Sequence, residues 1–120
     1  MQKYRNKKVQ LGNRVIDSKR EARRYQTLLL LQKAGNISDL RMQVKYELIP
    51  TIREPDVIGP RGGVRKGKVI EHGVSYVADF VYKDESGCEI VEDSKGFRTA
   101  DYIIKRKLML WIHGIRIKEV

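Results

Sequence analysis

The sequence predicts an α/β (α+β) domain in which a mixed β-sheet is flanked by helices. Its 120 residues, of which 41% are hydrophobic, suffice to bury the core of one domain. Helical and strand periodicities follow one another in the order α-β-β-β-α-β, with no internal repeat. Strands bounded by helices in this way pack as a sheet with helices against its faces.

The first predicted element is a helix that follows a basic arm. Residues 1–17 are basic and weakly patterned, so we expect an arm that orders only partly, ahead of a single domain over 18–120. Ser18-Lys-Arg-Glu21 has the form of a capping box and predicts a helix that runs to Gly35. The apolar stripe of this helix contains Ala22, Tyr25, Leu28, Leu29 and Leu31.

A strand and a glycine-rich segment come next. Val44–Pro50 alternates apolar and polar residues and ends in proline, which predicts a strand. Residues 51–73 lack clean periodicity and contain a basic, glycine-rich stretch, which predicts a mobile loop or a flexible β-ribbon. This segment is either a solvated loop or an arm that contacts DNA through its cations. The cations in question are Arg61, Arg65, Lys66 and Lys68.

A β-hairpin is predicted after this segment. Its strands cover about 74–82 and 88–95, and Lys83–Gly87 has the length of a hairpin turn. Pairing of Tyr82 with Cys88 would close the hairpin symmetrically around that turn. We therefore take this pairing as the expected register.

The last elements are a second helix and a closing strand. Thr99 can cap a helix over about 100–112, and Gly114 ends it. Residues 115–120 then form a short strand. The spacing i, i+4, i+7 predicts that the core-facing stripe of the helix consists of Ile104, Leu108 and Trp111.

Composition limits the classes of partner. Lys and Arg total 25 against 15 Asp and Glu, which gives a net charge of +10 and a pI of about 9.9. Such an excess favours a polyanion, above all nucleic acid. The longest apolar run, Leu28–Leu31, is far shorter than the roughly 20 residues of a membrane-spanning helix. A single cysteine fits a reducing compartment, so we expect a cytoplasmic protein without a membrane partner.

Acidic residues on the hairpin suggest chemistry. In the expected register Asp79 is diagonal to Asp93, about 7–8 Å away at the backbone, and Lys95 shares the face of Asp93. Two such carboxylates can share a divalent cation, which in a basic chain suggests metal-dependent cleavage of nucleic acid. The alternative is a structural ion pair between Asp79 and Lys95. Glu92 points to the opposite face, and Glu21 serves either as a helix cap or as a further site residue.

The order of elements, with Glu21 in the first helix, Asp79 in the second strand and Asp93-Ser-Lys95 in the third, resembles the PD-(D/E)xK nuclease superfamily. This superfamily includes restriction enzymes and Holliday junction resolvases. Three stretches are similar to a small phage and prophage group described as endonuclease-like or of unknown function. They are Ser18–Tyr25, Val77–Tyr82, and Val91–Gly96 leading into Thr99 and Lys105–Lys107. Ala78 stands where the superfamily often has proline.

The resemblance implies a restriction-endonuclease-like core and a metal-dependent DNA endonuclease. Asp79 and Asp93 would hold Mg²⁺, with Glu21 and the carbonyl of Ser94 as further ligands and Mn²⁺ as a substitute ion. Lys95 would act on the attacking water, as a fourth catalytic residue beside Glu21, Asp79 and Asp93. Lys105 and Lys107 would join the cations of 51–73 in binding DNA.

The resemblance leaves the substrate open. A phage Holliday junction resolvase acting in DNA recombination is the leading interpretation, and a homodimer is expected because a junction is cut symmetrically. A nicking or restriction-like nuclease acting on duplex or flaps is the alternative. A protein of another class, binding nucleic acid without cutting it, would need no Mg²⁺.

Overall fold

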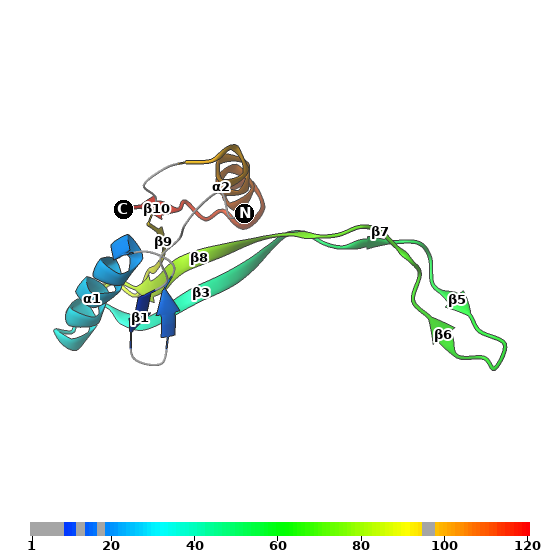
Figure 1. Cartoon of the computed structure of the whole chain (residues 1–120), viewed down its shortest axis with the longest axis horizontal. Helices are drawn as coiled ribbons and strands as arrows, with labels where there is room; N and C mark the ends of the chain where they lie inside the picture. The colour runs from blue at the N-terminus through cyan, green and yellow to red at the C-terminus, as the bar shows by residue number, and fades with distance from the viewer. Residues whose placement is uncertain (1–8, 12–13, 17–18, 95–97) are drawn as a thin grey trace.

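The computed structural model describes residues 9–11, 14–16, 19–94 and 98–120. Within them, two helices flank a four-stranded mixed sheet, which confirms the α/β class (Figure 1). The strand order is β10-β9-β8-β3, in which β10 is parallel to β9 and the other neighbours are antiparallel. In chain order these elements are α1 (Lys19–Lys33), β3 (Ser38–Ile49), β8 (Val74–Lys83), β9 (Glu89–Asp93), α2 (Ala100–His113) and β10 (Lys118–Glu119).

Part of the basic N-terminal segment, residues 1–17, forms a small hairpin. β1 (Val9–Leu11) pairs antiparallel with β2 (Arg14–Ile16). This hairpin lies beside α1 (Figure 1). In the described part of the chain, no helix has the length and apolar character needed to cross a membrane.

Local capping determines the ends of α2, as the sequence predicts. Thr99 has an extended backbone, and its side-chain oxygen accepts a hydrogen bond of 3.2 Å from the backbone N–H of Tyr102. At the other end Gly114 adopts a left-handed conformation, with φ of 67°; its N–H donates to the Leu110 carbonyl and the N–H of Ile115 donates to the Met109 carbonyl. Both caps satisfy backbone groups that a helix end leaves without partners.

Of the three residues predicted to face the core from α2, only Leu108 packs against it. Tyr102 and Met109 are the buried residues of this helix, whereas Ile104 is exposed and Trp111 has 83% of its surface exposed. Apolar residues lie around the whole circumference of α2, so their spacing alone cannot select the face that meets the sheet. Packing of the Tyr102 ring, 6.4 Å from that of Tyr76, accompanies the observed orientation.

Two apolar clusters lie on the sheet, one beside each helix. The cluster beside α2 contains Val81 and Val91 of the sheet, and the cluster beside α1 contains Phe80 and Tyr82. Neighbouring residues of β8 thus alternate between the clusters, as strand geometry requires. This alternation places Leu28 of α1 and Met109 of α2 in two separate cores.

The alternation breaks at Asp79. Val81, Ala78 and Tyr76 all belong to the cluster beside α2, although a regular strand would place Val81 on the opposite face from the other two. On β3, Met42 pairs with Phe80 and Val44 with Ala78, so Gln43 lies opposite Asp79. Gln43 has a φ of 53°, which is uncommon for a residue other than glycine. The β3–β8 ladder is therefore distorted where the first candidate aspartate lies.

The β8–β9 hairpin has a different register from the expected one. Lys83 pairs with Glu89, so Tyr82 faces Ile90 and not Cys88. The reason is local: the Asp84 side chain accepts hydrogen bonds of 2.9 Å from the backbone N–H groups of Ser86 and Cys88. This cap holds the turn one residue later than predicted.

Residues 50–73 form a long β-ribbon, here called the arm, that projects from the end of β3 and β8 (Figure 1). The glycine-rich stretch, predicted as a mobile loop or a flexible β-ribbon, lies within this ribbon. A compact chain of this length has a radius of gyration of about 13–14 Å, whereas the observed value is 18.8 Å because of the arm. Two antiparallel pairs build it: β4 (Ile52–Arg53) with β7 (Val69–Glu71), and β5 (Val57–Ile58) with β6 (Val64–Arg65).

Candidate active site

Two buried aspartates lie side by side on neighbouring strands. Phe80 pairs with Glu92, and continuing this register by one residue places Asp79 opposite Asp93. Only 8% of Asp79 and 1% of Asp93 are exposed. Their carboxyl groups share a hydrogen bond, and Asp79 Oδ2 also accepts one of 2.8 Å from the backbone N–H of Ser94. The expected diagonal pair is therefore a directly opposed pair, two residues closer in register.

The protonation of Asp79 reflects this environment. Burial is the largest cause that raises the pKa of Asp79 to about 9, and the hydrogen bond and negative charge of Asp93 act in the same direction. The N–H of Ser94 acts in the opposite direction, because it stabilises the carboxylate. The pair therefore retains a proton at neutral pH, which a cation bound between the two carboxyl groups would displace.

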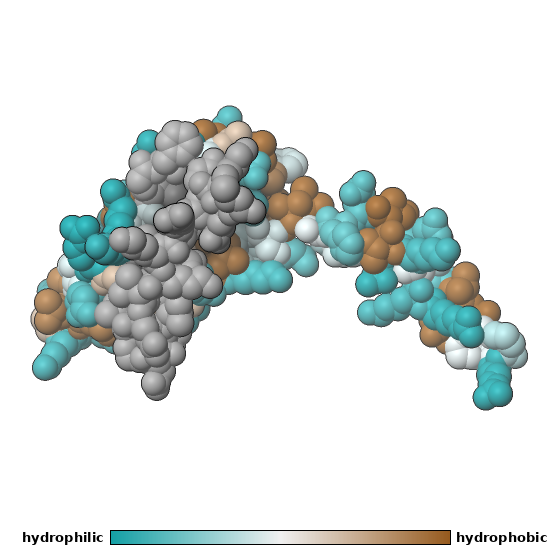
Figure 2. Space-filling model, viewed as in Figure 1, coloured by the Kyte–Doolittle hydropathy of each residue, from teal (hydrophilic) through white to brown (hydrophobic). Residues whose placement is uncertain are grey.

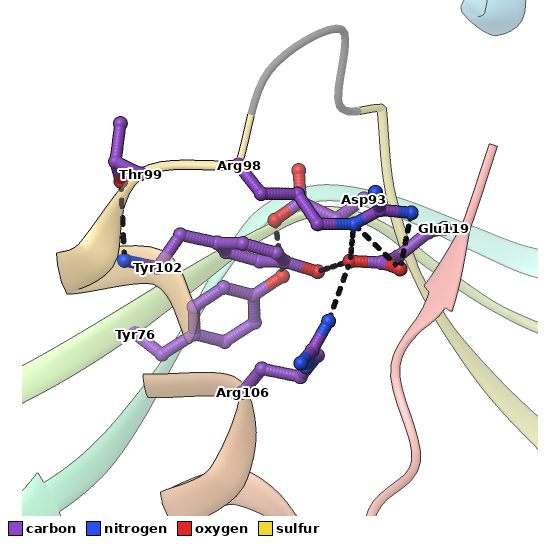
Figure 3. Close-up of polar contacts among 7 residues, drawn as sticks. All are labelled: Tyr76, Asp93, Arg98, Thr99, Tyr102, Arg106 and Glu119. Carbon is purple, nitrogen blue, oxygen red and sulfur yellow. Dashed lines mark hydrogen bonds and ion pairs between the residues drawn. The ribbon is translucent and has the colours of Figure 1, made fainter. Parts of the chain in front are cut away.

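Two tyrosines lie against Asp93 on the side of α2 (Figure 3). The Tyr76 hydroxyl donates a hydrogen bond of 2.6 Å to Asp93 Oδ2, and burial raises the pKa of Tyr76, so this donor stays protonated. The Tyr102 hydroxyl donates one of 2.7 Å to Glu119 Oε2. Tyr76 thereby holds the orientation of the Asp93 carboxylate.

A cluster around Glu119 closes the site beside β10 (Figure 3). Arg98 lies 3.0 Å from Glu119 Oε1 and Arg106 lies 3.4 Å from Oε2. The hydrogen bonds from Arg98 and Tyr102 lower the pKa of Glu119 to about 2. Glu119 therefore stays ionised and joins β10 to the start of α2. Sequence reasoning missed this cluster, because Glu119 carries no local motif.

Glu92 points to the opposite face, as expected. Its fully buried carboxylate forms a two-pronged ion pair with Arg24 of α1, through contacts of 2.5 and 2.9 Å, and accepts a hydrogen bond from the Tyr82 hydroxyl. The hydrogen bond to Glu92 raises the pKa of Arg24, so the guanidinium stays charged. This triad fastens α1 to the sheet.

Glu21 faces the aspartate pair from α1. It lies in the first helical turn and is partly buried, and its negative charge contributes to the raised pKa of Asp79. Ser18, the other half of the expected capping box, lies outside the described residues. The structure thus places the charge of Glu21 near Asp79.

Lys95, the expected catalytic lysine, also lies outside the described residues. Ser94 precedes it and is partly buried. The backbone N–H of Ser94 binds Asp79. Its side-chain Oγ is buried and has no hydrogen-bond partner in the described part of the chain. Within the described ranges, no group of three or more Asp, Glu, His or Cys side chains is arranged to hold a metal ion.

An arginine-lined groove of about 380 Å³ adjoins Ser94. Arg20, Arg23 and Arg24 line it from one face of α1, and Arg20 also donates a hydrogen bond of 2.9 Å to the carbonyl of Val120. Sequence reasoning missed this set, although the spacing i, i+3, i+4 in a helix is a signal that could have found it. The groove offers positive charge next to the aspartates.

The expected DNA-binding cations are dispersed. Lys105 lines a cavity of about 270 Å³ with Tyr76 and Tyr102, close to Asp93. Lys107 is exposed and, being two residues further along α2, points to a different side of the helix. The remaining four are exposed on the arm, away from the aspartates (Figure 1). These are Arg61, Arg65, Lys66 and Lys68.

Comparison with known proteins yields one family. The model of the family described as "Protein of unknown function (DUF1064)" matches residues 1–115. No curated protein and no solved structure matches the chain. Because the family model covers nearly all of it, the chain belongs to the DUF1064 family.

Proposed function

We propose that this protein is a metal-dependent DNA endonuclease with a restriction-endonuclease-like core, resembling the PD-(D/E)xK superfamily. The observation that carries the proposal is the opposed pair Asp79 and Asp93, buried and sharing a hydrogen bond. Burial, the hydrogen bond with Asp93 and the negative charge of Asp93 raise the pKa of Asp79 to about 9. Perturbed, paired carboxyl groups of this kind are typical of functional sites.

The donor atoms fit a hard divalent cation. Mg²⁺ prefers oxygen ligands and is commonly held by one or two carboxylates together with substrate phosphates, so a pair of aspartates suffices. Asp79 and Asp93 would hold the ion, with Glu21 and the carbonyl of Ser94 as further ligands, and we expect Mn²⁺ to substitute. When bound, the ion would neutralise charge on the scissile phosphate and lower the pKa of a coordinated water.

The other residues have distinct tasks in phosphodiester hydrolysis. Water oxygen forms a bond to phosphorus while the bond to the 3′ oxygen breaks, and Lys95 would orient or deprotonate that water. Arg20 and Arg23 would contact phosphates in the groove beside Ser94. Tyr76 and the N–H of Ser94 would keep the two aspartates oriented.

The proposed substrate is branched DNA, as for Holliday junction resolvases acting in phage recombination. Symmetric cutting of a four-way junction requires two sites, so we expect a homodimer. The proposed setting is the cytoplasm of a bacterium that carries the phage or prophage. A nuclease acting on duplex or flaps is the second candidate, and the same experiment separates the two.

The test is cleavage of a labelled four-way junction beside matched duplex, flap and single strand. Wild type, Asp93→Asn and the exposed control Asp101→Asn are compared in Mg²⁺ and in EDTA. We expect paired nicks in Mg²⁺ that are confined to the junction, lost in Asp93→Asn and retained in Asp101→Asn. Cleavage of every substrate would overturn junction selectivity, and binding without cleavage in Mg²⁺ or Mn²⁺ would overturn the nuclease.

A further inference from the structure

The tip of the arm carries an exposed apolar pair. Ile58 pairs directly with Val64, so their side chains share one face of the ribbon, and 79% and 71% of their surfaces are exposed. Pro60, also exposed, lies in the turn between them. The opposite face of the same pair of strands carries Val57 and Arg65. Apolar and hydrophilic residues are interspersed along the arm in Figure 2.

Positive charge concentrates at the same end. Between Val57 and Lys68 the chain has four Lys and Arg residues and no Asp or Glu. The acidic residues of the arm, Glu54, Asp56 and Glu71, all lie nearer its base. The distal half of the arm is therefore both basic and apolar.

Close backbone contacts join the two sides of the arm. Glu54 N–H donates to the Lys68 carbonyl at 2.8 Å, and the Gly67 N–H donates to Asp56 at 3.1 Å. A Cβ atom at Gly67 would lie 1.8 Å from the Glu54 carbonyl oxygen, so only glycine permits this close approach of the two sides of the arm. The Arg53 guanidinium, which donates to the Gly67 carbonyl at 3.1 Å, completes the brace.

The charge identifies the partner that the tip fits. A second copy of this chain has a net charge of +10 and an equally basic arm, so two tips repel each other. Duplex DNA combines an anionic backbone with an apolar base stack. Two-stranded ribbons fit the major groove, and apolar side chains inserted from the minor groove separate base pairs and kink the duplex.

We propose that the arm enters a groove of duplex DNA and that Ile58, Val64 and Pro60 wedge between base pairs. Roughly eleven residues at about 3.3 Å each separate the base of the arm from its tip, so the tip reaches about one helical turn, some 34–36 Å, along the DNA. The cations Arg61, Arg65, Lys66 and Lys68 hold the phosphates beside the wedge. This inference rests on the proposed function for DNA as the partner, and it adds bending as the means by which deformable or branched DNA is selected.

The experiment uses the full chain in EDTA, where no cleavage is expected, and a duplex labelled at both ends for energy transfer. A second duplex carries 2-aminopurine, whose fluorescence rises when it is unstacked. Wild type is compared with the double variant Ile58→Thr/Val64→Thr, which keeps β-branched side chains. The matched control is Val57→Thr, on the opposite face of the ribbon.

We expect wild type and Val57→Thr to bend the duplex and unstack the probe, and the double variant to do neither. The affinity of the double variant Ile58→Thr/Val64→Thr for DNA should depend on salt as that of the wild type does. Arg65→Ala/Lys66→Ala should instead reduce the slope of log affinity against log salt concentration by about 0.9 per lost phosphate contact. Wild-type bending by the double variant would overturn the wedge. The wedge would also be overturned if the double substitution converted a dimer to a monomer and left bending unchanged, because the tip would then contact protein.

Failure of the wedge and failure of the nuclease are distinguishable. A chain that bends DNA in EDTA and cuts nothing in Mg²⁺ retains the wedge and loses the nuclease. A chain that cuts in Mg²⁺ but leaves DNA straight and stacked retains the nuclease and loses the wedge.

Discussion

Replacement of Asp79 by asparagine should stabilise the metal-free protein at neutral pH. The ordinary aspartate pKa of 3.8 is raised to about 9 in the folded protein. Folding at pH 7 therefore takes up a proton that the unfolded chain does not bind. Because the folded pKa is raised, the stability of the wild type is highest below pH 3.8 as far as this group is concerned, and it is lost progressively as the pH rises toward 9.

The size of the effect follows from that proton uptake. Between pH 3.8 and pH 7 the cost grows by about 1.4 kcal/mol per pH unit, up to about 4 kcal/mol. Structural relaxation and water entry around the buried carboxyl group reduce this cost, so we expect a gain of about 1–3 kcal/mol for Asp79→Asn at pH 7. The asparagine oxygen can still accept from the N–H of Ser94, and its amide can donate to Asp93. Packing is therefore retained.

Urea unfolding in EDTA at several pH values from 5 to 9 measures this prediction. The stability of the wild type should fall with pH relative to Asp79→Asn, and the exposed control Asp101→Asn should follow the wild type. Added Mg²⁺ should stabilise the wild type and leave Asp79→Asn unchanged, since a ligand stabilises only the state that binds it. A variant less stable than wild type at both pH 7 and pH 8 would refute the reasoning and favour a structural ion pair.

Three further predictions concern packing. Trp111→Ala should change the unfolding free energy by no more than about 0.5 kcal/mol, because Trp111 is exposed. Loss of a buried aromatic side chain would cost about 3–5 kcal/mol. Urea unfolding distinguishes these two magnitudes. Glu92→Gln should cost about 3 kcal/mol or more in the same assay, since it leaves the Arg24 charge without its buried partner. Gly67→Ala should increase proteolysis within the arm and leave the thermal melting of the body unchanged, because the added Cβ meets the Glu54 carbonyl.

Local features were predictable where a few neighbouring residues decide the structure. Thr99 and Gly114 end α2 as expected, because a cap depends only on the adjacent turn. The hairpin that joins Asp79 to Asp93 was predictable for the same reason, since only a short turn separates its strands. Its register was missed by two residues, because the side-chain bonds of Asp84 were not foreseen.

Features that depend on distant partners were not predictable. The ion pair of Arg24 with Glu92 joins residues 68 positions apart, and no local pattern identifies this pairing. The choice between the faces of α2 depends on which apolar residues meet the sheet, and here Met109 packs inside while Trp111 stays outside. The spacing of apolar residues in the sequence is compatible with either face.

By itself, the sequence determined the order of elements, the excess of positive charge and the proximity of two aspartates across a hairpin. These follow from periodicity, composition and a short loop. Only the tertiary structure decided that Asp79 faces Asp93 directly at a distorted point of the ladder, and that Tyr76 and Glu21 approach the pair. It also decided that residues 50–73 project as a braced ribbon, because the close approach of Gly67 to Glu54 requires contacts between chain segments that no local pattern specifies.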